Sequence, residues 1–252
     1  QMKAGIACGQ ATQKVLADTY WKINSARKIL PTKNIKLTKE VALQEAIEKF
    51  KEYQSLDDKD QTKKDHYLET IPQTVKQIFL ALEKLIGDGA SAPKVTCEKC
   101  LSADHTDLLV PIVGRTDFEF NAFLGDPSPG FFLIELKTVW DRFGRKKKDG
   151  SFSLIRARLP SSPSEAHLCQ SAFYSAVYDY QFPIYLIYAC SDDYEIYDSS
   201  NCPGLTKQGL KKNFNKLVSV AKRRERMFLR YNDLTREEII RNIVADTDPG
   251  FS

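Results

Sequence analysis

One segment, Phe131 to Val139, constrains the fold of this chain more than any other. Its nearly continuous apolar start, Phe131-Phe132-Leu133-Ile134, predicts a central β-strand that is covered on both faces. Glu135 and Lys137 follow in the same strand, and because they are two residues apart their side chains share one face. A charge in an apolar strand costs free energy unless it is paired. The segment therefore predicts a covered sheet that carries a charged site.

The order of the predicted elements around this strand indicates an α/β (α+β) fold, in which helices flank a central mixed sheet. Apolar residues recur at helical spacing before Gly87, and the pattern changes to strand-like alternation after Pro93. Ser164 is the predicted N-cap of a later helix. The predicted helices are 11–29, 39–54, 71–86, 164–180 and one from about 206 onward, and the predicted strands are 95–101, 108–120, 131–139, 183–190 and 194–197.

The length of 252 residues suits one compact domain with extensions. The pattern predicts a helical N-terminal extension over 1–65, a core over 66–200, and a basic helical C-terminal segment over 201–252 that packs on the core. The very polar stretch Asp57 to Asp65 predicts a surface link or the solvated first turn of a helix.

No run approaches the roughly 18 to 20 apolar residues that a membrane helix needs. The N-terminal residues also lack the long apolar core of a signal peptide. The sequence therefore predicts a cytoplasmic protein with no membrane partner.

The cysteine pattern favours free thiols. Cys97 and Cys100 have the spacing of a zinc knuckle, but the chain has six cysteines and no second matched pair. Cys97 also lies in an alternating stretch, where a cysteine behaves as a small apolar residue. We therefore expect reduced cysteines.

The positive charge is clustered. The net charge is only +4, but five basic residues follow the Glu135 strand directly: Arg142, Arg145, Lys146, Lys147 and Lys148. Such a cluster can neutralise a phosphate backbone. A second cluster, between Lys211 and Arg230, is explained equally well as a solvated helix face.

Two carboxylates are predicted to lie close together. Asp117 closes the motif Gly114-Arg115-Thr116-Asp117, and adjacent strands would place it beside Glu135. Close carboxylates are the ligands that Mg²⁺ or Mn²⁺ prefers, and a nearby Lys137 could hold a water for hydrolysis. The alternative is that Asp117 is a turn residue and Glu135 a charge at the sheet edge.

The helix that follows carries Gln170 and Tyr174, four residues apart and hence on one face. His167 is three residues before Gln170 and could share that face, at most as a residue that supports the groups of the site. Core packing of Tyr174 and a polar helix face at Gln170 are the plainer interpretation.

Together, the motifs G-x-x-D, E-x-K and Q-x-x-x-Y resemble those of the PD-(D/E)XK nucleases, in particular the RecB-type and phage exonuclease branch. The resemblance covers about residues 66 to 200 and implies a restriction-endonuclease-like αβββαβ core. It implies one or two Mg²⁺ or Mn²⁺ ions held by Asp117, Glu135 and the carbonyl of Leu136. The tight C-terminal cysteine trio of some relatives is absent, so no iron–sulfur cluster is expected.

The same resemblance assigns further roles. Gln170 and Tyr174 would contact the DNA backbone or a catalytic carboxylate, and an upstream helix would add a metal ligand. Glu69 is the preferred candidate for that ligand, with Glu83 and His66 as alternatives. Further residues that could grip phosphate are Arg115, Arg156 and Arg158.

The function implied by the resemblance is a metal-dependent DNA exonuclease of phage-type recombination or degradation. It would act on ends of linear duplex or on single strands, attacking a phosphodiester in line with water and freeing a 5′-phosphate. A single-strand annealing or recombination protein would be a fitting partner, and the oligomeric state stays open. The alternatives are a structure- or sequence-specific endonuclease of the same fold, and a catalytically silent DNA-binding protein.

Overall fold

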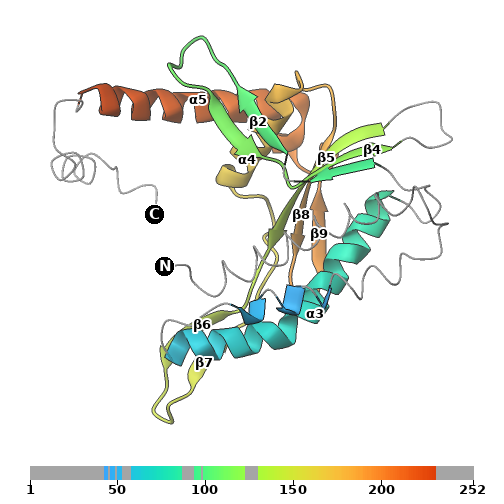
Figure 1. Cartoon of the computed structure of the whole chain (residues 1–252), viewed down its shortest axis with the longest axis vertical. Coiled ribbons are helices and arrows are strands. Elements are labelled where there is room, and N and C mark those ends of the chain that lie inside the picture. The colour runs from blue at the N-terminus through green and yellow to red at the C-terminus, as the bar shows by residue number, and fades with distance from the viewer. Residues whose placement is uncertain are drawn as a thin grey trace.

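The computed structural model describes residues 43–52 except 45 and 49, residues 58–86, residues 94–122 except 98, and residues 130–230. The predicted helix over 11–29 and the C-terminal tail lie outside these ranges. The elements, drawn in Figure 1, are α3 (Asp58–Ile86), β1 (Lys94–Cys97), β2 (Cys100–Ala103), β3 (Ile112–Arg115), β4 (Phe118–Ala122), β5 (Gly130–Thr138), β6 (Arg142–Lys146), β7 (Phe152–Ile155), α4 (Glu165–Val177), β8 (Ile184–Ala189), β9 (Tyr194–Tyr197), the 3₁₀ helix η1 (Pro203–Leu205) and α5 (Lys207–Arg230).

A five-stranded mixed sheet organises the described chain, with the strand order β1-β4-β5-β8-β9. The central strand β5 is parallel to β8 and antiparallel to β4, and the outer pairs are antiparallel. Helix α3 covers one face of the sheet, while α4 and α5 lie on the other side (Figure 1). The predicted α+β class, with helices around a central mixed sheet, is confirmed.

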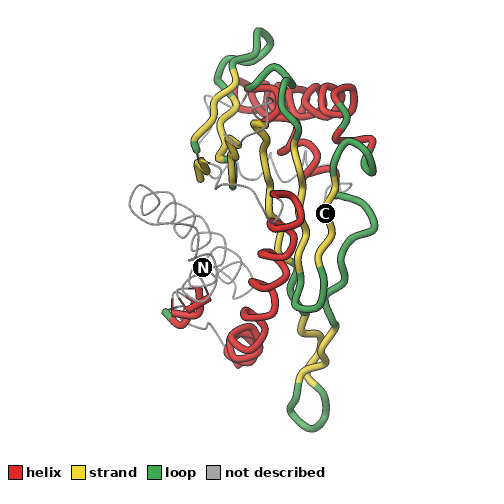
Figure 2. The backbone as a smooth tube through the Cα atoms, turned by 90° about the vertical axis from the view of Figure 1, so that its right-hand side faces the viewer, coloured by secondary structure: helices red, strands yellow, loops and turns green. Residues whose placement is uncertain are grey.

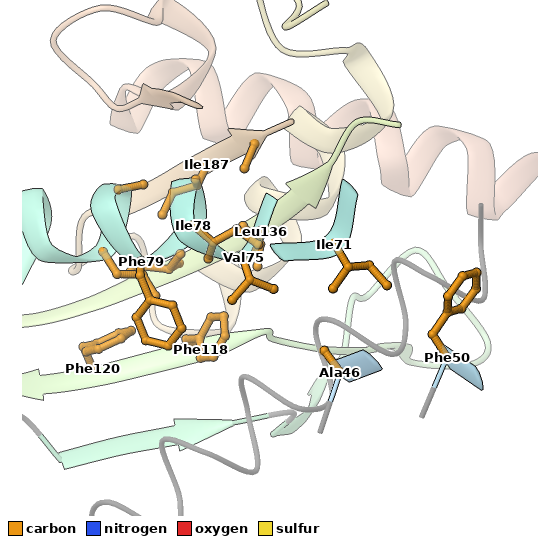
Figure 3. Close-up of a cluster of buried hydrophobic side chains, with 14 of the residues drawn as sticks. Ala46, Phe50, Ile71, Val75, Ile78, Phe79, Phe118, Phe120, Leu136 and Ile187 are labelled. Atoms are coloured by element: carbon orange, nitrogen blue, oxygen red, sulfur yellow. The ribbon is translucent and has the colours of Figure 1, made fainter. Parts of the chain in front are cut away.

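The α3 face of the sheet is an apolar core (Figure 3). Ile71, Val75 and Ile78 of α3 meet Phe118 and Phe120 of β4, together with other fully buried side chains of β5 and β8. Each large side chain buried in this way stabilises the fold by about 1.5–3 kcal/mol. The even-numbered residues of β5, Ile134 and Leu136, belong to this core. Its odd-numbered residues therefore point to α4.

Helix α3 is longer than predicted. It begins at Asp58 instead of Ile71, so the polar stretch that could have been a surface link forms the first turns of a helix. The predicted domain boundary at 66 falls inside this helix. Pro72 lies within α3, where it removes one backbone hydrogen bond, and Figure 1 shows that the helix bends.

Two predicted strands are each interrupted. The strand predicted over 95–101 is divided between β1, in the main sheet, and β2, which pairs with β3 in a separate hairpin. The strand predicted over 108–120 begins at Ile112 and breaks at Thr116 and Asp117 between β3 and β4. Asp117 thus lies in a break between strands instead of inside one.

A second hairpin, β6–β7, was not predicted. It projects from the end of the molecule opposite α5 (Figures 1 and 2), so the two basic clusters of the sequence lie far apart. The predicted helix after Ser164 and the strands at 183–190 and 194–197 are confirmed as α4, β8 and β9 within a few residues. Within the described residues, no helix is long and apolar enough to cross a membrane.

Candidate metal and phosphodiester site

The register of β4 and β5 brings the two predicted carboxylates together. Phe118 pairs with Ile134, and the two strands are antiparallel. Asp117, one residue before Phe118, therefore lies beside Glu135, one residue after Ile134. The Asp117 carboxylate also accepts a hydrogen bond of 2.7 Å from the backbone N–H of Leu136, through Oδ2. This bond holds the Asp117 side chain against the central strand, although Asp117 lies just before the first residue of β4.

Glu135 is completely buried, on the face of the sheet that α4 covers. Its Oε1 accepts a hydrogen bond from the Lys137 ammonium, two residues along the same face. Its Oε2 is equally buried and has no hydrogen-bond partner among the described residues. A buried charged oxygen without a partner is costly, so this atom is a candidate for a ligand contact.

The electrostatics of the pair point in the same direction. Burial, and next the Asp117 carboxylate, raise the pKa of Glu135 from 4.5 to about 8, against the opposing effect of Lys137. Two carboxylates in a dry site repel each other, and a bound cation removes that repulsion. The site is therefore suited to a divalent ion rather than to a second negative group.

The residues present fit Mg²⁺ or Mn²⁺, since oxygen donors from Asp117 and Glu135 converge and one donor is unused. Leu136 contributes its N–H to Asp117, while its side chain is buried in the core on the other face. Its carbonyl as a metal ligand stays a prediction.

Glu69 does not join these carboxylates. It is exposed on α3, the helix that covers the opposite face of the sheet. Within the described ranges, no group of three or more His, Cys, Asp or Glu is placed to hold a metal. The choice of Glu69 as a third ligand finds no support in this geometry, because helical spacing alone does not reveal which face of a sheet a helix will cover.

Gln170 and Tyr174 hold the segment that contains Asp117 through two consecutive hydrogen bonds. Gln170 Nε2 donates to the Tyr174 hydroxyl at 2.6 Å, and that hydroxyl donates to the backbone carbonyl of Arg115. The predicted contact of Tyr174 with a carboxylate or DNA is therefore not what its hydroxyl makes in this structure. Burial raises the pKa of Tyr174, so the hydroxyl keeps the proton that it donates.

Gly114 lets α4 approach this segment. A Cβ on Gly114 would lie 2.6 Å from Cε1 of Phe173 and 3.4 Å from Cε1 of Tyr174. Only a residue without a side chain leaves room for these rings. The Gly of the G-x-x-D motif thus serves helix packing, and the Asp serves the site.

The basic residues divide into two groups. Five exposed basic residues lie on or next to the β6–β7 hairpin: Arg142, Arg145, Lys146, Lys147 and Lys148. Arg158, which follows the hairpin, and Arg115, which is close to Asp117 in the sequence, are also exposed. Arg156 is also exposed, and it makes an ion pair of 3.2 Å with the buried Asp141. Its role in gripping phosphate stays a prediction.

Asp141 is a buried residue that the sequence analysis missed. Its Oδ1 accepts the N–H of Ala157 at 2.6 Å, and its Oδ2 lies 2.8 Å from Nε2 of His66. The Tyr67 hydroxyl donates to its backbone carbonyl at 2.8 Å. Asp141 therefore ties α3 to both ends of the β6–β7 hairpin. The sequence shows only an aspartate soon after a strand, which is a common turn position.

Comparisons with known proteins do not assign this chain to a family. No family model matches it, and no curated protein matches it. A solved structure titled "Crystal structure of SSO0001" aligns over 73% of this chain and 86% of its own, at 15% identity and a TM-score of 0.30. A likeness this weak carries no argument, so the function has to be inferred from the site.

Proposed function

We propose that this protein is a divalent-metal-dependent deoxyribonuclease that hydrolyses phosphodiester bonds at the Asp117–Glu135–Lys137 site. The observation that carries the proposal is the fully buried Glu135, which has one paired and one unpartnered oxygen beside a second carboxylate. A structural ion pair would need only Lys137. The additional carboxylate and the unused oxygen are what a cation site requires.

The residues of the site divide the work. Asp117 and Glu135 would hold Mg²⁺ or Mn²⁺, which when bound supplies positive charge to polarise the scissile phosphate. Lys137 lies on the same strand face and would orient the attacking water and offset negative charge on the phosphate. Gln170 and Tyr174 would keep the Asp117 segment in place through the Arg115 carbonyl.

DNA as the substrate is supported by charge and by the motif resemblance. The β6–β7 hairpin extends from the sheet beyond the end of β5 (Figure 2), and its exposed basic residues could follow a phosphate backbone. The exonuclease assignment within this proposal rests on the Q-x-x-x-Y resemblance alone.

The test is degradation of end-labelled linear duplex and single-stranded DNA with Mg²⁺ or Mn²⁺, comparing wild type with Glu135→Ala and Lys137→Ala. We expect metal-dependent loss of DNA by wild type and none by either variant. A covalently closed circular substrate distinguishes exonuclease from endonuclease, because only an endonuclease cuts it. Binding of DNA without cleavage under either metal would favour a silent DNA-binding protein instead.

A further inference from the structure

The side chain of His167 adjoins the candidate site from α4, one turn before Gln170. Its Nδ1 lies 2.5 Å from the hydroxyl of Tyr188, and Tyr188 is the strand partner of Lys137 across β5 and β8. Paired residues of neighbouring parallel strands project from the same face. His167, Tyr188 and Lys137 therefore belong to one cluster beside Glu135.

The hydrogen bonds around Tyr188 bear on which nitrogen of His167 carries the proton. The backbone N–H of Ser164 can only donate, and it donates to the Tyr188 hydroxyl at 3.4 Å. The Tyr188 hydroxyl can then give its single proton to Nδ1 of His167. A neutral imidazole that accepts at Nδ1 carries its proton at Nε2.

The environment keeps this imidazole neutral. Burial, and next the charge of Lys137, lower the pKa of His167. Burial raises the pKa of Tyr188, so its hydroxyl remains protonated. The ring is only half-buried, and its Nε2 makes no hydrogen bond with the described residues. With Nδ1 as acceptor, His167 presents one oriented N–H donor that has no acceptor among the described residues.

We propose that His167 is a substrate-contacting residue whose Nε2–H donates a hydrogen bond to a non-bridging oxygen of the phosphate that Lys137 faces. The proposal deepens the nuclease proposal and rests on it. A neutral donor complements Lys137, because it adds a directed hydrogen bond without a second ammonium beside the cation site. Tyr188 is a positioning residue in this arrangement, since it acts only by setting the tautomer.

The tautomer can be measured without any nuclease activity. The chain contains three histidines, so a ¹⁵N NMR comparison of wild type with His167→Gln identifies the His167 signals by difference. We expect the Nε2–H tautomer in wild type and a mixture of tautomers in Tyr188→Phe. A wild-type spectrum with the proton on Nδ1 would overturn the proposal.

Activity tests the contact itself. His167→Ala should lower kcat/KM by about 10- to 100-fold, the expected loss of one hydrogen bond to a charged group. His167→Gln offers an amide N–H at a similar reach and should recover most of that loss, while thermal melts of both variants report folding. Wild-type kcat/KM in His167→Ala, in the same assay in which Lys137→Ala is inactive, refutes the contact and leaves the nuclease proposal standing.

Failure of the nuclease proposal is recognised separately. If wild type cleaves no DNA under any metal, DNA affinity measured by fluorescence anisotropy still decides the role of His167. Weaker binding by His167→Ala than by His167→Gln supports the phosphate contact. Equal affinity of wild type and both variants overturns it.

Discussion

Two buried glutamates on neighbouring strands show how the same residue type can be structural in one place and functional in another. Glu119 of β4 and Glu135 of β5 are 3% and 0% exposed, and both face α4 beside a lysine. The carboxylate oxygens of Glu119 are all used: Lys99 donates to one at 3.1 Å, and the Tyr178 hydroxyl donates to the other at 2.5 Å. Glu135 has only Lys137, and its second oxygen has no partner among the described residues.

The difference lies in what surrounds each acid. Glu119 is enclosed by donors from Lys99, Thr116 and Tyr178, the residue that follows α4, and these stabilise its charge and leave nothing for a ligand to bind. Glu135 has a second carboxylate, Asp117, where Glu119 has donors. A buried acid whose donors are complete stabilises the fold, whereas an acid placed beside another acid costs stability until a cation arrives. This contrast yields four predictions.

The largest effect should be on catalysis. Glu135→Gln removes the charge of the proposed metal ligand and should lower metal-dependent DNA cleavage on the order of 10³-fold or more, by comparison with loss of other electrostatic catalytic groups. Glu119→Gln, on the same sheet face, should stay within a few-fold of wild type. Initial rates with saturating Mn²⁺ measure both, and equal losses in the two variants would remove the distinction.

The next effect concerns the packing that encloses Glu135. Gly114→Ala places a Cβ 2.6 Å from Phe173 and should cost about 1–3 kcal/mol of unfolding free energy, as overpacking does. Phe173→Leu alone also lowers stability, but adding it to Gly114→Ala makes room, so the double variant should be more stable than the two single costs predict. Urea unfolding measures all four proteins. If the two losses of unfolding free energy simply add, the Phe173 ring does not limit how closely α4 approaches Gly114.

The two glutamates should also differ in stability. Glu119→Gln breaks the pair with Lys99 and should lower the unfolding free energy by about 1 kcal/mol, since Lys99 is partly exposed and can turn to water. Glu135→Gln removes a repelling charge and should be neutral or stabilising at pH 8 in the presence of a chelator. Chemical denaturation at that pH compares them, and a larger loss in Glu135→Gln would contradict the contrast.

The last effect is a pH slope. The pKa of Glu135 rises from 4.5 to about 8 in the folded state, so between these values the folded chain holds a proton that the unfolded chain has lost. Stability of the metal-free protein from this residue is complete below pH 4.5 and falls as pH rises toward 8, by about 1 kcal/mol per unit or less. The melting temperature should change less between pH 5 and 8 for Glu135→Gln than for wild type. An equal change in both proteins would mean that the pH dependence does not come from the pKa of Glu135.

The sequence predicted the elements whose patterns are local. The apolar start of β5 and the cap Ser164 were sufficient for a central strand and for α4, and the Ser164 side chain accepts from the backbone N–H of His167 as a cap should. Asp117, Glu135 and Lys137 were brought together as expected, because neighbouring antiparallel strands leave few other registers.

What the sequence did not predict depends on contacts between distant residues. The first turns of α3 are polar and contain no local reason to prefer helix over a link, and its Pro72 argues against a continuous helix. The β6–β7 hairpin is largely exposed and basic, so it lacks the apolar alternation of a covered strand. The position of Glu69 depends on tertiary packing in the same way, since packing sets the face that its helix covers, and its role as a metal ligand stays a prediction.

The most direct measurement of the central claim is Mn²⁺ binding by calorimetry, without DNA, to wild type, Glu135→Gln and Glu119→Gln at pH 8. The account predicts saturable binding to wild type and to Glu119→Gln, and its loss or severe weakening in Glu135→Gln. Absence of binding to the folded wild type, or equal affinity in all three proteins, would contradict the assignment of a metal site to Asp117 and Glu135.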